Sequence, residues 1–264
     1  MKDIDFNQVS QQITDFLKRH KSSLHEIVKH NTNVFEAFCF ILFVQYYETA
    51  GYQLEPKNLL DGKFRFKYNT RGYPWNYSYF AAVSSESKEG ESQVLFEIRH
   101  NQQVSGAWVE IGEEDGIAPP MFALDVAVIK AESLPQLEQG QKRNNENYWV
   151  DNAHLITFAE AKKLTAYPML LAQFLGIVHE VKPEFLRSDS REITDTDSDD
   201  QHPHPILFTS NHLSSGTAKV LESFEARELR MMVVENVTSV PGEMLVRKMR
   251  KKAKKSTDGT KSPI

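Results

Sequence analysis

The sequence predicts an α/β (α+β) fold in which a central mixed sheet is flanked by helices and preceded by an N-terminal helical extension. Apolar residues recur at helical spacing over the first 50 positions, and strand-like apolar runs separated by polar turns begin at Lys63. Further along the chain, helical and strand patterns alternate without an internal repeat. With 264 residues, 40% of them hydrophobic, the chain has enough apolar material for a substantial core.

Two helices are predicted at the N-terminal end. Residues 6–30 carry apolar side chains three and four positions apart, which is the period of an amphipathic helix. Residues 33–50 are apolar around most of a helical circumference, and Gly51 follows where a helix would stop. We therefore expect the second helix to be buried.

The remaining elements follow from changes of period and from turn residues. Strands are expected within 64–68, 73–83, 93–104, 121–129, 154–162, 205–210 and 231–237. Helices are expected from Pro168 to about Val181 and over 214–230, the latter with a serine cap. The segments 131–152 and 188–203 are polar and are interpreted as surface insertions.

These elements define three parts: an N-terminal helical extension (1–32), an α/β domain (33–246) and a basic tail (247–264). The tail carries a net charge of +7, which leaves −12 on the rest of the chain. We expect the tail to be disordered, and it either adds nonspecific attraction to nucleic acid or is merely solvated. The acidic body argues against a broad phosphate-binding face and permits a metal site built from carboxylates.

Composition and missing motifs exclude several classes. The only cysteine, Cys39, allows no intrachain disulfide, and the longest apolar run is far too short to span a membrane. The charged N-terminus is unlike a secretory signal, so a cytoplasmic location without membrane contact is expected. The signatures of serine hydrolases, P-loop NTPases and dinucleotide-binding proteins do not occur. His202 and His204 are expected to be solvated in a loop.

Charged residues inside two apolar strand runs are the strongest chemical signal. Asp125 lies within FALDVAVIK, and Glu160 and Lys162 end the run LITFAEAK. A buried and unpaired carboxylate costs several kcal/mol, so such residues pair with one another or bind a cation. Residues two apart on a strand share a face, which places Glu160 and Lys162 together and leaves the carbonyl of Ala161 at the strand edge.

The triplet of an acid, any residue and lysine is not specific by itself, because it occurs five times in the chain. Only the copy at Glu160 closes an apolar run and follows an aspartate in an earlier one. From these residues alone, a structural ion-pair cluster and a metal-binding site are both open.

In this arrangement the sequence resembles the restriction-endonuclease-like, or PD-(D/E)XK, nuclease superfamily. There a helix precedes an antiparallel meander of three strands, with the aspartate on the second strand, the acid-x-lysine triplet on the third, and a helix and a further strand after it. The matching segments here are 33–50, 93–104, 121–129 with Asp125, 154–162 with Glu160, and the helix and strand that follow. Leu124 replaces the proline of the motif, and 35 positions separate the two acids, so residues 131–152 must be an insertion.

The resemblance implies a restriction-endonuclease-like core and a magnesium-dependent nuclease acting on DNA, with bacterial or phage-related defence as the setting. Asp125, Glu160 and the Ala161 carbonyl would hold Mg²⁺ or Mn²⁺, and Lys162 would act on the attacking water. Glu97 is a candidate third acid of this site. The alternative is that Glu97 is an ordinary surface glutamate on its strand. Glu36, Glu48 and Gln173 are further candidates for the same site.

The expected partner is nucleic acid, in particular DNA, with a homodimer or a protein partner left open. Cations are proposed for DNA contact at these positions: Lys163, Arg247, Lys248, Arg250, Lys251 and Lys252. The competing hypothesis is a non-catalytic interaction protein of nuclease-like fold, in which the acids form ion pairs and the basic tail docks a partner.

Overall fold

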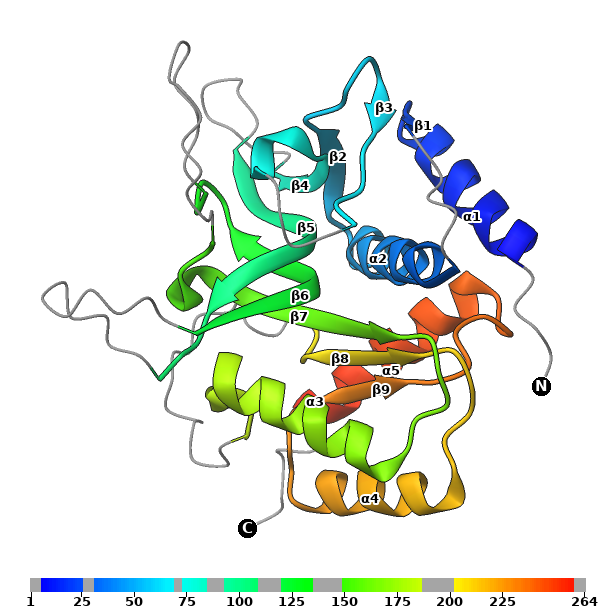
Figure 1. The fold of residues 1–264 in the computed structure, drawn as a ribbon, viewed down its shortest axis with the longest axis vertical. Coiled ribbons are helices and arrows are strands. Elements are labelled where there is room, and N and C mark those ends of the chain that lie inside the picture. The colour runs from blue at the N-terminus through cyan, green and yellow to red at the C-terminus, as the bar shows by residue number, and fades with distance from the viewer. Residues whose placement is uncertain are drawn as a thin grey trace, which may run out of the picture.

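A seven-stranded mixed sheet lies at the centre of the computed structural model, which describes residues 6–25, 31–68, 73–84, 93–108, 120–134, 149–186 and 202–258 (Figure 1). The strand order is β2-β4-β5-β6-β7-β8-β9. The strands are β2 (Gln53–Lys57), β4 (Tyr79–Val83), β5 (Val94–Ser105), β6 (Met121–Lys130), β7 (Leu155–Lys162), β8 (Ile206–Thr209) and β9 (Met232–Val234). The short parallel pair β1 (Ser23–Leu24) and β3 (Lys63–Phe64) stands apart from it.

Helices flank the sheet, which confirms the predicted fold class at the level of a mixed sheet between helices. They are α1 (Phe6–Arg19), α2 (Asn31–Thr49), α3 (Pro168–Val181), α4 (Ser215–Ala226) and α5 (Gly242–Asp258). One apolar cluster joins α1, α2 and α5 to the sheet, and a second joins α3 and α4 to it. No helix among the described residues is both long enough and apolar enough to cross a membrane.

The connectivity around β6 and β7 determines where the charged residues meet. Strands β5, β6 and β7 are consecutive antiparallel neighbours, and β8 lies parallel to β7 after the α3 crossover. Most of the segment between β6 and β7, residues 135–148, lies outside the described residues, and the two strands are nevertheless paired. The expected adjacency of 121–129 and 154–162 is confirmed.

The first helix is shorter than its apolar period predicted. It ends at Arg19, and Lys21 adopts a left-handed backbone with φ of 52°, which ends the helical path. Its apolar face, with Phe16 and Leu17 almost fully buried, belongs to the same cluster as α2. The N-terminal extension is thus packed into the core of the domain.

The expectation of a disordered basic tail beginning at residue 247 is wrong for residues 247–258. These residues continue α5, which begins at Gly242. Leu245 and Met249, four positions apart, are 1% and 0% exposed and anchor the helix in the main cluster. An ideal Cβ on Gly242 would lie 3.2 Å from Leu42 Cδ2, so the glycine permits the close approach of α5 to α2.

Two histidines expected in solvent, His202 and His204, are half-buried. The predicted insertion 188–203 lies outside the described residues except for its last two, and those are packed. His202 Nδ1 lies 2.9 Å from the hydroxyl oxygen of Tyr47 on α2. Burial lowers the pKa of His202 to about 4 and that of His204 to about 4, with Arg230 adding to the effect at His204.

Candidate functional site

Asp125 lies where the ladder between β6 and β7 ends. The last register pair at this end joins Val126 to Ala159. Asp125 is one residue beyond Val126, and Ala161 is two beyond Ala159; the backbone N–H of Ala161 donates to Asp125 Oδ2 at 2.8 Å, so the carboxylate replaces a backbone acceptor. Since the N–H and C=O of a strand residue point to the same neighbour, the Ala161 carbonyl also lies on this side.

Lys162 connects the two acids. Its Nζ donates to Glu160 Oε2 at 2.7 Å and to Asp125 Oδ2 at 3.3 Å. The two-residue period of β7 places Glu160 and Lys162 side by side, and the antiparallel pairing brings Asp125 to them. The three side chains singled out in the sequence therefore meet in one site.

Glu160 is the most deeply buried member of this site. Its side chain is 5% exposed, against 15% for Asp125 and 36% for Lys162. Glu160 Oε1 is buried without a hydrogen-bond partner in the part of the chain that the structure describes. A buried acceptor without a partner is costly, and a cation or a donor placed beside it would remove that cost.

The electrostatics of the site are those of excess negative charge. Burial raises the pKa of Glu160, the charge of Asp125 raises it further, and Lys162 lowers it in part. Burial alone would lower the pKa of Lys162, but the charges of Glu160 and Asp125 outweigh it and raise that pKa above its usual value. Lys162 is thus held as a cation between two carboxylates.

A third acid approaches from α2. Burial, followed by the charge of Asp125, raises the pKa of Glu36 from 4.5 to about 7, and Lys162 acts in the opposite direction. The thiol of Cys39, one turn further along α2, also has a raised pKa, first through burial and then through Asp125. The charge of Asp125 thus acts on two side chains of α2, the helix that packs against β6 and β7.

His100 on β5 lies opposite Val126, next to Asp125, and no motif in the sequence singles it out. Its Nδ1 donates to the Lys67 carbonyl at 2.7 Å, because a carbonyl can only accept. Burial lowers the pKa of His100 to about 4, although the charge of Asp125 acts to raise it. The ring is therefore neutral with an unprotonated Nε2, and that atom is buried without a partner among the described residues.

Three other candidates do not reach this group. Glu97 on β5 is paired with Arg99 at 2.6 Å and lies opposite Ile129, roughly 13 Å along β6 from Asp125. Glu48 lies 2.8 Å from His20 Nε2. Gln173 is exposed on α3 and takes no part in the described hydrogen bonds of the site.

The basic candidates for DNA contact are divided between solvent and the fold. Lys163, at the C-terminal end of β7, is partly exposed, and Arg247, Lys248 and Lys251 lie exposed on α5. The other two bind the protein itself: Arg250 Nη1 donates to the Thr49 carbonyl, and Lys252 Nζ donates to the Val233 carbonyl at 3.2 Å.

The donor set fits a hard divalent cation in chemistry, although the ligands are not gathered around a vacant position. Within the described ranges no three His, Cys, Asp or Glu side chains form a complete metal-binding group. Asp125 and Glu160 instead share the Lys162 ammonium, and the unpartnered Glu160 Oε1 adds an oxygen donor. Carboxylate and carbonyl oxygens are the ligands that Mg²⁺ and Mn²⁺ prefer.

Comparison with known proteins found no match to a protein family, to a curated protein or to a solved structure.

Proposed function

We propose that this protein is a divalent-metal-dependent nuclease that hydrolyses phosphodiester bonds in DNA, an endonuclease of bacterial or phage-related defence. The observation that carries the proposal is the meeting of Asp125, Glu160 and Lys162 within hydrogen-bond distance, where the end of β7 lies beside the middle of β6. The order of an antiparallel β5-β6-β7 meander, the α3 crossover and the parallel strand β8 supports a restriction-endonuclease-like core.

Each residue has a role that follows from its surroundings. Asp125, Glu160 and the Ala161 carbonyl would hold one or two Mg²⁺ or Mn²⁺ ions, with Glu36 in reach from α2. Such an ion, when bound, polarises the scissile phosphate and lowers the pKa of the attacking water. Lys162, held protonated by its two neighbours, orients that water and stabilises the negative charge that develops on the phosphate.

The excess of acidic groups supports the metal requirement. Burial raises the pKa of Glu36 to about 7, and burial also raises the pKa of Glu160. Both carboxyl groups therefore keep their protons to a higher pH than an exposed glutamate does. A divalent cation would favour their ionised forms. We therefore expect activity to rise with pH between about 6 and 8 as protons stop competing with the metal.

Cations away from the site are expected to hold the DNA. The C-terminal end of α2, where Arg250 binds Thr49, lies about 20 Å along the helix from Glu36. The exposed cations of α5 would thus contact phosphates distant from the scissile bond, and Lys163 would contact phosphates near it. Counterion release predicts that binding through these residues weakens steeply with salt.

The test is cleavage of supercoiled plasmid DNA by the purified protein with Mg²⁺, Mn²⁺ or chelator. Wild type should nick the plasmid with either metal and stop with chelator. Asp125→Asn and Lys162→Ala should each reduce the rate by a factor of a hundred or more, on the order of 3 kcal/mol in the barrier.

Lys57→Ala is the matched control, because Lys57 and Glu55 form the same triplet on β2 with Nζ 2.7 Å from Oε2 but without a second acid contact among the described residues. It should cleave like wild type. If wild type leaves DNA and RNA substrates intact with both metals, the nuclease is refuted. The ion pairs would then favour a non-catalytic interaction protein.

A further inference from the structure

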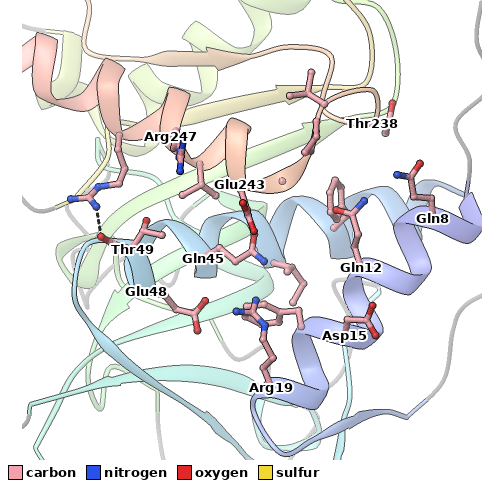
Figure 2. A pocket seen from close by; sticks show the side chains of 18 of the residues that line it. Gln8, Gln12, Asp15, Arg19, Gln45, Glu48, Thr49, Thr238, Glu243 and Arg247 are labelled. Carbon is pink, nitrogen blue, oxygen red and sulfur yellow. Dashed lines mark hydrogen bonds between the residues drawn. The ribbon is translucent and has the colours of Figure 1, made fainter.

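A large cavity lies on the side of α2 that faces α1 and α5, away from the candidate nuclease site. Its volume is about 1100 Å³, and it is bounded by the two helices, α2 and the segment 238–242 (Figure 2). This volume slightly exceeds the range of about 300–1,000 Å³ that is typical of sites for small organic ligands. None of Asp125, Glu160 and Lys162 lines it.

Polar side chains without partners converge on this cavity from three helices. Gln12 of α1, Gln45 of α2 and Arg247 of α5 line it, and none of them makes a hydrogen bond or an ion pair among the described residues. An ideal Cβ on Gly242 would lie 3.6 Å from Gln12 Oε1 and 3.5 Å from Gln45 Oε1, so both amides lie near the start of α5. Donors and acceptors are thus available together.

The cavity is lined by three arginines, Arg19, Arg247 and Arg250, and by three acids, Asp15, Glu48 and Glu243, and these groups differ in how far they are engaged. Two of its acids are already engaged: Asp15 accepts from Gln11 at 2.8 Å, and Glu48 lies 2.8 Å from His20. The guanidinium of Arg19 lies over the Phe16 ring at 5.1 Å rather than against a carboxylate. Neither Arg19 nor Arg247 forms an ion pair among the described residues, so each guanidinium remains available to an anionic group.

Apolar side chains form part of the remaining wall, beside the polar Gln8, Thr49, Thr238 and Ser239. Phe38 and Ile41 of α2 and Val246 of α5 line the cavity between the polar groups. A ligand that matches these particular groups combines an anionic group for a guanidinium, hydrogen-bonding edges for two amides and an apolar face. A nucleotide has all three, through its phosphate, its base edge and the face of its base.

We propose that this cavity is a nucleotide-binding site. The phosphate lies at Arg247, and the edge of the base is read by Gln12 and Gln45. The occupant is either a free nucleotide or the terminal nucleotide of a strand, since both present the same chemistry. The proposal does not depend on the nuclease, because no residue of the Asp125 site takes part in it.

The experiment is isothermal titration of the full-length protein in chelator with each of the four ribonucleoside 5′-monophosphates. Inorganic phosphate and the nucleosides are titrated separately, as is a 5′-phosphorylated single-stranded oligonucleotide. We expect at least one monophosphate to bind more tightly than phosphate or its nucleoside alone. Tighter binding of the oligonucleotide than of any monophosphate would identify a strand end as the occupant, and the reverse order a free nucleotide.

Variants locate the site. Arg247→Ala and Gln45→Ala should each weaken nucleotide binding about tenfold or more, while Arg227→Ala, an exposed arginine at the end of α4 and outside the cavity, should not change it. Thermal melts establish that each variant is folded. Absence of binding by every probe overturns the proposal, and so does binding that Asp125→Asn abolishes while Gln45→Ala leaves it intact. Equal affinity for phosphate and nucleotides would leave only an anion site and would also overturn it.

Discussion

Lys162→Ala tests whether the charged site is built for a metal or for its own ion pairs. The substitution removes an ammonium that contacts Glu160 at 2.7 Å and Asp125 at 3.3 Å. Breaking a fully buried pair costs about 3–5 kcal/mol, because the remaining charge is left without a partner. Lys162 keeps 36% of its side chain exposed, so solvent screens part of this loss. We expect about 2–3 kcal/mol in chelator.

The matched variant Lys57→Ala calibrates that value. Lys57 and Glu55 have the same spacing and the same 2.7 Å distance, but their side chains are 40% and 38% exposed. Exposed pairs contribute up to about 1 kcal/mol, so the loss should be small. The difference between the two variants isolates the effect of burial and of the second carboxylate.

The assay is urea denaturation of both variants and wild type, first in chelator and then in excess Mg²⁺. At ~2–4 °C per kcal/mol for a chain of this size, Lys162→Ala should also melt roughly 4–12 °C below wild type in chelator. If Asp125 and Glu160 bind a divalent ion, Mg²⁺ takes over the role of the lost ammonium and restores most of the stability. A loss in Lys162→Ala that Mg²⁺ does not reduce would refute the metal site and support a structural ion-pair cluster.

Three further outcomes are expected. The pKa of Glu36 is raised from 4.5 to about 7, so between these pH values the folded state binds more protons than the unfolded state. The free energy of unfolding in chelator should therefore fall as the pH rises from 4.5 to 7. Glu36→Gln should flatten this pH dependence in thermal melts. Met249→Ala should cost about 2–4 kcal/mol in urea denaturation, since Met249 is 0% exposed, whereas Lys251→Ala should cost nothing measurable. Tyr47→Phe should lower the free energy of unfolding by about 1 kcal/mol, because it removes the hydrogen bond between the Tyr47 hydroxyl and His202. A melting temperature equal to that of wild type would contradict a stabilising role for this hydrogen bond.

The strands that carry the site were predictable because both signals involved are local. Asp125 lies in one apolar run, and Glu160 and Lys162 end another. The two-residue period of a strand then predicts which face of the strand each acid is on, without reference to the neighbouring strands. The pairing of these strands followed from their order once the intervening segment was treated as an insertion. Edge strand β2 was missed, since Pro56 and its polar neighbours resemble a turn, and such residues are tolerated only at an edge.

The basic C-terminal segment illustrates the opposite case. Its run of lysines and arginines dominates the composition, so the apolar stripe through Leu245, Met249 and Ala253 was overlooked. Long basic side chains coexist with a buried helix because their charged ends reach solvent or the carbonyl groups of neighbouring elements. Lys252 does the latter at Val233, and burial, then Lys248, lowers its pKa.

The choice between Glu97 and Glu36 as the third acid depends on information that no local pattern holds. Glu97 lies on the strand beside β6, which made it the nearer candidate in sequence order, but its register places it opposite Ile129 and its carboxylate against Arg99. Glu36 lies on a helix whose apolar residues cover most of its circumference. The sequence pattern therefore does not predict toward which neighbouring element the Glu36 side chain points. Only the packing of α2 against β6 and β7 brings it within reach of the charge of Asp125. A carboxylate so placed costs stability unless a cation joins it, which is why the third ligand of the proposed metal is expected on α2 rather than on β5.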